Sequence, residues 1–208
     1  PWIQSLAAES LAYLGPEVRK SSVSDLLQLT VTPNPNDPRR MVQRAVSAAL
    51  FSPGPGSREP RSILAESIEG VDRKQLYPAI ISLLQNQDSV TRGSVAKTFK
   101  SLSDSDLVTL LPEVVKATEK MAPSGEMFAD GIRLAGLDLL SRLNIREGMD
   151  LCMSVWEPSR WGAGKRAPKC IEYLARYGTH AQAYLPEIEK LLNGNSKAPK
   201  KTDVKDEG

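Results

Sequence analysis

Hydrophobic residues recur at helical spacing along most of the chain. The clearest stretch is 73–102, where two apolar stripes flank the polar residues 85–87. The first stripe consists of Leu76, Ile80, Leu83 and Leu84, and the second of Val95, Ala96, Phe99 and Leu102. Offsets of three and four place each set on one helical face, which predicts two short amphipathic helices with Asp88 as the N-cap of the second. Neither helix can bury its stripe alone, so each must pack on a neighbour.

Part of this two-helix unit is repeated elsewhere in the chain, each time around a proline. The segment Leu76–Ile80 matches 110–114 and 184–188, and their prolines, Pro78, Pro112 and Pro186, are 34 and 74 residues apart. A degenerate copy without proline is expected near residue 149. A period of about 34–40 residues with two helices per period is typical of a helical solenoid. The prolines themselves are interpreted as structural, in a first helical turn or at a kink.

The remaining pattern predicts further helices and the loops between them. Helices are expected at 2–14, 22–31, 38–50, 61–69, 106–120, 126–143, 146–156, 162–177 and 180–193. Inward stripes are expected at Ile3, Leu6, Ala7, Leu11 and Leu14, at Phe128, Ile132, Ala135, Leu139 and Leu143, and at Leu185, Ile188, Leu191 and Leu192. Gly131 and Gly136 predict close approach between helices. The Pro/Gly-rich stretch 52–60 predicts a loop, and 195–208, with a single valine as its largest apolar residue, predicts a disordered tail.

Residues 37–50, with the sequence DPRRMVQRAVSAAL, carry a family resemblance. They resemble the inner helix of a HEAT repeat, in particular the short HEAT-like repeats of the phycobilisome-lyase type within the armadillo-like α-solenoid superfamily. The resemblance implies an all-α fold: a right-handed α–α superhelix of about ten helices in antiparallel pairs. We expect one such domain over 1–194. Because the chain begins at Pro1 inside a helical pattern, we interpret it as a fragment of a longer protein. Such repeats serve many unrelated roles, so the resemblance specifies the fold rather than the function.

Amino-acid composition excludes several classes of functional site but does not identify a function. The 27 basic and 25 acidic residues leave a net charge of +2, so any attraction to a polyanion must come from local clusters. No apolar run is long enough to predict a membrane span. Cys152 and Cys170 fall in apolar stripes and are interpreted as buried free thiols, with a bridge between neighbouring helices left open. With His180 as the single histidine, the sequence predicts no catalytic residues, no metal site and no cofactor.

Basic residues concentrate on the second helix of three of the four repeats. In HEAT-type solenoids these helices line the concave face, so the resemblance implies a basic binding face there. Its candidate residues are Arg44, Arg92, Lys97, Lys165, Arg166 and Lys169. The alternative is that these charges simply form the solvated faces of amphipathic helices. Trp156 and Trp161 flank the turn before the most basic helix and are candidate stacking platforms.

Two binding functions follow as hypotheses, and a purely architectural spacer, with no groove and no exposed aromatic pair, is the third possibility. The first is a non-enzymatic scaffold that mediates protein–protein interaction within a larger multidomain protein. The alternative is a nucleic-acid-binding solenoid with a basic concave face. In a DNA-glycosylase-like version of this alternative, Trp156 and Trp161 would stack on bases and Asp150 would be the acid of the site. The sequence predicts neither the compartment nor the oligomeric state.

Overall fold

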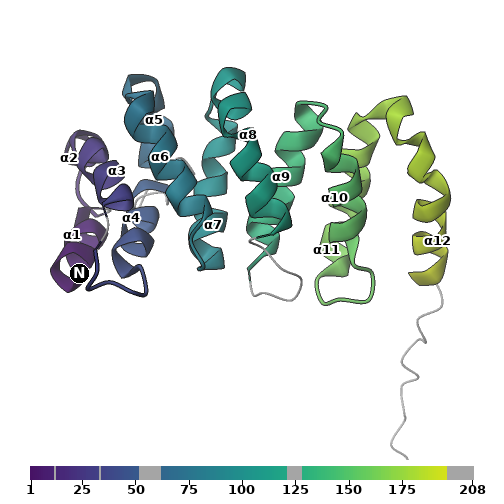
Figure 1. Cartoon of the computed structure of the whole chain (residues 1–208), viewed down its shortest axis with the longest axis horizontal. Helices are drawn as coiled ribbons and strands as arrows, with labels where there is room; N and C mark the ends of the chain where they lie inside the picture. The colour runs from purple at the N-terminus through teal and green to yellow at the C-terminus, as the bar shows by residue number, and fades with distance from the viewer. Residues whose placement is uncertain (12, 33, 52–61, 121–127, 196–208) are drawn as a thin grey trace, which may run out of the picture. The chain divides into compact units, whose positions relative to one another are not determined.

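The chain folds into helices, as its computed structural model shows (Figure 1). The structure describes residues 1–11, 13–32, 34–51, 62–120 and 128–195, and these contain no strand. Their first helices are α1 Trp2–Leu11, α2 Pro16–Ser21, α3 Val23–Val31, α4 Met41–Phe51, α5 Ile63–Ser67, α6 Arg73–Leu84, α7 Ser89–Val95 and α8 Asp104–Glu119. They are followed by α9 Asp130–Arg142, α10 Glu147–Trp156, α11 Ala163–Arg176 and α12 Leu185–Asn195. Short 3-10 helices cover Ile68–Gly70 (η1), Ala96–Lys100 (η2) and Gly178–Tyr184 (η3).

These elements form two compact units. Unit 1 is Pro1–Leu140 and unit 2 begins at Ser141, so the boundary falls within α9. A single domain over 1–194 stays a prediction. The expected loop at 52–60 and the tail beyond residue 195 lie outside the described residues, as do residues 121–127.

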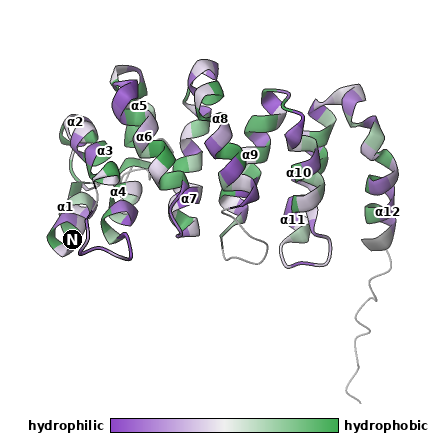
Figure 2. Ribbon diagram, in the orientation of Figure 1, coloured by the Kyte–Doolittle hydropathy of each residue, from purple (hydrophilic) through white to green (hydrophobic). Residues whose placement is uncertain are grey.

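The helices of unit 1 pack in two rows (Figure 1). In one row α3 packs on α6 and α6 packs on α8, and in the other α1 packs on α4 and α4 packs on α7. Contacts of α3 with α4 and of α6 with α7 join the rows. The predicted stripe of α6 is confirmed, since Leu76, Ile80, Leu83 and Leu84 are fully buried. Figure 2 shows the mixture of hydrophobic and hydrophilic residues around each helix that this packing requires.

Side-chain N-caps explain where α7 and α8 begin. The Asp88 carboxylate accepts from the backbone N–H of Thr91 at 2.9 Å, as expected of the N-cap of α7. Ser103 and Asp106 form a capping box at the start of α8. The helix predicted over 89–102 is divided, because its second half tightens into the 3-10 helix η2.

Three predicted apolar stripes are wrong in part. α1 buries Ser5 and Ala8, while Ile3 and Leu6 are 82% and 52% exposed. These small buried residues let α1 lie close against α4. Phe128 is 63% exposed; it lies before the start of α9 and has a positive φ of 65°, so it does not share the helical face of that stripe.

α12 carries the third of these stripes. Leu185 and Leu192 are 51% and 48% exposed, whereas Ile188 and Leu191 are half-buried. The packing of α12 against η3 therefore leaves much of its apolar face uncovered within unit 2. The sequence did not predict α2, in which Pro16 occupies the first helical turn.

The glycines of α9 lie at close helix–helix contacts, as predicted. A Cβ at Gly131 would lie 3.4 Å from the Cα of Gly93 in α7. A Cβ at Gly136 would lie only 2.0 Å from Thr118 Oγ1 in α8. Thr118 is itself buried and donates to the Val114 carbonyl at 2.8 Å, so it has little room to move.

Gly136→Ala is therefore expected to destabilise the protein by about 2 kcal/mol through overpacking. Adding Thr118→Ala removes the clashing hydroxyl and should recover part of that loss, so the two changes are non-additive. Denaturant unfolding of the two single variants and the double variant measures the coupling. Simple additivity would show that α8 and α9 are not in close contact at this point.

Unit 2 is built on the pairing of α10 with α11. Cys152 and Cys170 come from these two helices, and both are buried thiols that form no disulfide, as the sequence predicted. A hydrogen bond with Cys170, together with burial, raises the pKa of the Cys152 thiol, which keeps it protonated and unreactive. The Tyr177 hydroxyl donates to the Ile145 carbonyl at 2.8 Å and fixes the end of α11 against the segment before α10. Burial also raises the pKa of the Tyr177 hydroxyl well above its ordinary value.

Candidate functional site

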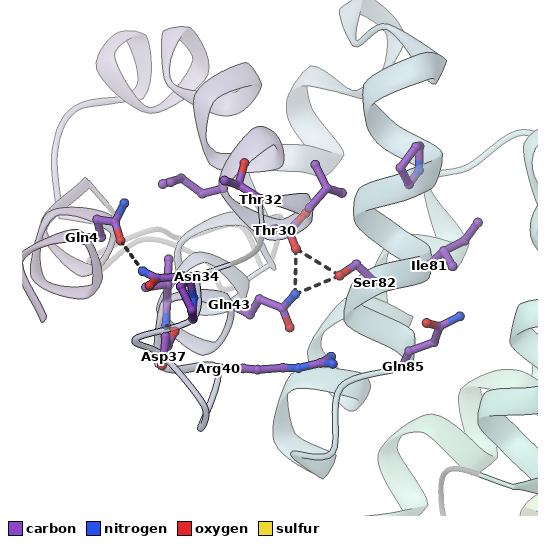
Figure 3. Close-up of a pocket in the computed structure, with 15 residues that line it drawn as sticks. Gln4, Thr30, Thr32, Asn34, Asp37, Arg40, Gln43, Ile81, Ser82 and Gln85 are labelled. Carbon is purple, nitrogen blue, oxygen red and sulfur yellow. Dashed lines mark hydrogen bonds between the residues drawn. The ribbon is translucent and has the colours of Figure 1, made fainter. Parts of the chain in front are cut away.

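Unit 1 contains a groove of about 810 Å³ (Figure 3). Residues from α1, α3, α4, α6 and the segment between α3 and α4 line it. They are Gln4, Leu29, Thr30, Val31, Thr32, Asn34, Pro35, Asp37, Arg40, Val42, Gln43, Pro78, Ile81, Ser82 and Gln85. Many of these side chains are exposed or half-buried, so the groove opens to solvent.

A hydrogen-bond network closes the base of the groove. Gln43 Nε2 donates to the Thr30 carbonyl at 2.7 Å and to Ser82 Oγ at 2.8 Å. Ser82 Oγ donates in turn to the same carbonyl at 3.0 Å, and Asn86 Nδ2 donates to Gln43 Oε1 at 2.7 Å. The network connects α3, α4 and α6, so it fixes the base before any ligand arrives.

The rim of the groove combines apolar side chains with polar side chains that can form further hydrogen bonds. Val31, Pro35, Pro78 and Ile81 supply the apolar surface. Gln4 accepts from Asn34 Nδ2 at 3.2 Å through its oxygen, which leaves its own amide nitrogen to donate. Gln85 Nε2 donates to Glu113 at 3.1 Å, which leaves its oxygen to accept. Such a surface suits an extended chain that carries both apolar side chains and backbone amides.

The groove has two charged lining residues among those described, Asp37 and Arg40. The Asp37 carboxylate is buried and accepts from the backbone N–H groups of Met41 and Val42 at 2.8 and 2.9 Å. It thus satisfies the first backbone N–H groups of α4, which begins at Met41 and not at residue 38 as the sequence predicted. Arg40 is exposed and has a positive φ of 51°.

The basic residues predicted in unit 1 do not share one exposed face. Arg44 on α4 and Lys97 on η2 are exposed. Arg92 is 1% exposed, and its guanidinium donates to the carbonyls of Asn86 and Gln87 at 2.6 and 2.8 Å. Arg92 therefore holds the turn between α6 and α7 and offers no charge to a surface ligand.

The basic residues predicted in unit 2 are divided in the same way. Lys165 is exposed, and Lys169 forms an ion pair with Glu172 at 2.7 Å. Arg166 is buried and donates to the carbonyls of Trp161 and Glu157 at 2.8 and 3.2 Å. It stabilises the turn that leads into α11.

The two predicted stacking residues have opposite environments. Trp156 is fully buried, and its indole N–H has no hydrogen-bond partner. Trp161 is 92% exposed. Asp150 accepts a hydrogen bond from the Tyr184 hydroxyl. A glycosylase-like site that needs both tryptophans beside a free acid is therefore not assembled in unit 2.

Unit 2 has a cavity of its own, of about 450 Å³. It is lined by Asn144, Arg146, Met149, Tyr177, His180, Ala183 and Tyr184. Among the described residues there is no group of three or more His, Cys, Asp or Glu side chains that could hold a metal ion. Across the same part of the chain, no helix is both long and apolar enough to cross a membrane.

The amino-acid sequence did not predict the groove. Gln43 and Ser82 are polar residues at half-buried positions of helices, and their joint contact with the Thr30 carbonyl depends on how α3, α4 and α6 pack. The one local signal was the Asp-Pro-Arg-Arg sequence before α4, which contains both charged residues of the groove.

No protein-family model, curated protein or solved structure matches the chain. The case for a function therefore depends on the geometry of the described residues.

Proposed function

We propose that the chain is a non-enzymatic, HEAT-like helical-repeat scaffold that binds a protein partner within a larger multidomain protein, and that the groove of unit 1 receives an extended segment of that partner. The observation that carries the proposal is the groove itself. Its base is closed by internal hydrogen bonds, while its apolar walls and part of its polar rim remain open to a ligand.

The helix arrangement of unit 1 supports the repeat interpretation. Successive pairs α3–α4 and α6–α7 contribute to the same two rows, and α8 extends the row of α3 and α6. Pro78 and Pro112, the equivalent residues of the sequence repeat, lie inside α6 and α8, which are neighbours in one row. Stacked helix pairs of this kind present extended concave surfaces, which repeat proteins use for binding.

Selection from a random library of 12-residue peptides tests this function. We expect wild-type protein to enrich peptides that bind with micromolar affinity. Thr32→Trp should weaken that binding about tenfold or more, because Thr32 is an exposed lining residue whose enlargement obstructs the groove.

Thr109→Trp is the matched control. Thr109 is an exposed threonine on α8 with the same hydroxyl bond to the carbonyl four residues earlier, and it lies outside the groove. Equal loss in both variants, or no enrichment above a protein-free surface, would contradict the proposed function.

A second candidate function is nucleic-acid binding by unit 2. It is favoured by the 92% exposure of Trp161, which lies between the exposed residues Arg160 and Lys165. An exposed indole beside cations is the arrangement on which single-stranded bases stack. Anisotropy titrations with labelled single- and double-stranded DNA at about 50 and 200 mM salt test it. Binding should weaken steeply with salt and be reduced by Trp161→Ala, whereas no binding at the lower salt would exclude this function.

A further inference from the structure

The positive charge of the groove comes from one residue with a strained backbone, Arg40. Arg40 is not glycine, asparagine or aspartate, yet it adopts a left-handed backbone conformation with φ of 51°. For such a residue this conformation costs free energy relative to ordinary helical or extended backbone. A costly conformation persists where the surrounding structure imposes it, and such residues cluster at functional sites. The side chain extends along the groove toward Gln85, the residue that follows α6 (Figure 3).

The Arg40 guanidinium is available to a ligand. It makes no hydrogen bond or ion pair with any residue in the described part of the chain, and the side chain is exposed. The carboxylate of Asp37, the other charged lining residue, is buried and occupied by two backbone N–H groups of α4. A ligand in the groove therefore meets one unpaired positive charge.

This charge pattern identifies the kind of segment that fits. Guanidinium presents donors in a fork that matches a carboxylate. The neighbouring lining residues Gln43, Ser82 and Gln85 are neutral, and the first two are already occupied by the network at the base. A phosphate group is commonly bound by a cluster of arginines, whereas this groove offers one. The walls formed by Val31, Pro35 and Ile81 add apolar surface beside the charge.

We propose that the partner segment is an acidic peptide, bound with an aspartate or glutamate side chain on Arg40 and flanking apolar residues against the walls. This inference rests on the proposed function, because it names the partner class of the same groove. It predicts that peptides enriched from the random library contain Asp or Glu next to apolar residues.

The decisive variant is Arg40→Asn. Asparagine tolerates the left-handed conformation, so the fold is retained while the charge is removed. The affinity of enriched peptides should fall about tenfold, as expected for the loss of a charge-assisted hydrogen bond. Arg39→Asn is the matched control, since Arg39 is exposed, lies next to Arg40 and does not line the groove. Arg40→Asp should reverse the selection toward Lys- and Arg-containing peptides. Circular dichroism melts confirm that each variant is folded.

The outcomes separate this inference from the proposed function. If enriched peptides are sensitive to Thr32→Trp but lack acidic residues and bind Arg40→Asn as wild type, the acidic-peptide inference is overturned and the groove remains a peptide site. If no peptide is sensitive to Thr32→Trp, the proposed function itself fails. If replacing the acidic residue of an enriched peptide by phosphoserine improves binding tenfold, the ligand is a phosphopeptide and the carboxylate assignment is overturned.

Discussion

Asp106→Ala is expected to lower the free energy of unfolding by about 3 kcal/mol, because it leaves a part-buried ion pair and a helix cap without their acceptor. The Asp106 side chain is 4% exposed and faces the Arg73 guanidinium. Arg73 Nε and Nη2 each donate to one carboxylate oxygen at 3.0 Å, and the Tyr77 hydroxyl donates at 2.6 Å. The same carboxylate closes the capping box with Ser103. One side chain thus connects α6 to the start of α8.

Asp104→Ala is the matched control for this change. Asp104 is also an acid in the first turn of α8, but it is exposed. Its removal should cost less than about 1 kcal/mol, the size of an exposed helix-dipole interaction. Denaturant unfolding followed by circular dichroism compares the two variants. Equal losses would show that Asp106 acts only through its charge at the helix terminus and not through Arg73.

The same carboxylate predicts a pH dependence of stability. Hydrogen bonds from Arg73, then from Tyr77 and Ser103, hold the pKa of Asp106 well below its ordinary value. Because the folded state favours the charged form, this contribution is fully present above the unfolded pKa of about 4 and is lost as pH falls below it. The stability difference between wild type and Asp106→Asn should therefore shrink between about pH 5 and pH 2. A difference that is constant across this range would contradict the assigned role of the carboxylate.

Trp156→Ala is expected to destabilise the protein by about 4 kcal/mol, the loss typical of a large aromatic residue removed from a core. Trp156 is fully buried at the end of α10. Trp161→Ala should change stability by less than about 0.5 kcal/mol, since Trp161 is 92% exposed. Equal effects of the two substitutions, measured by denaturant unfolding, would contradict these opposite environments.

Trp156→Phe refines this prediction. The indole N–H is buried without a partner, which is a cost that phenylalanine does not carry. Phenylalanine also fills much of the space, so its loss of stability should be less than half that of alanine. A larger loss for phenylalanine than for alanine would show that the indole N–H makes a bond that stabilises unit 2.

The local sequence pattern predicted the positions of the helices better than it predicted which of their faces are buried. The stripe of α6 and the cap at Asp88 were correct, because helical periodicity and capping depend on residues a few positions apart. The buried face of α1 was wrong, because the contact with α4 selects Ser5 and Ala8 over larger apolar side chains. Hydrophobicity alone does not encode which face lets two helices approach closely.

The candidate site was less predictable than the fold. Charge counting singled out Arg92 and Arg166, yet both are buried and donate to backbone carbonyls of nearby turns. The sequence alone does not distinguish an arginine that stabilises a turn from an arginine that is exposed to bind a ligand. Arg40 differs through its left-handed backbone and its place in the groove, and both depend on the tertiary structure.

The most direct test of the account is to map the binding of an enriched 12-residue peptide on ¹⁵N-labelled protein by chemical-shift perturbation. We predict that the perturbed amides cluster at 29–43 and 78–86, with the Arg40 side-chain N–H among them, and that Thr32→Trp abolishes the changes. Perturbations confined to α11 and the Trp161 indole, or to the exposed face of α12, would contradict the claim that the groove of unit 1 is the binding site.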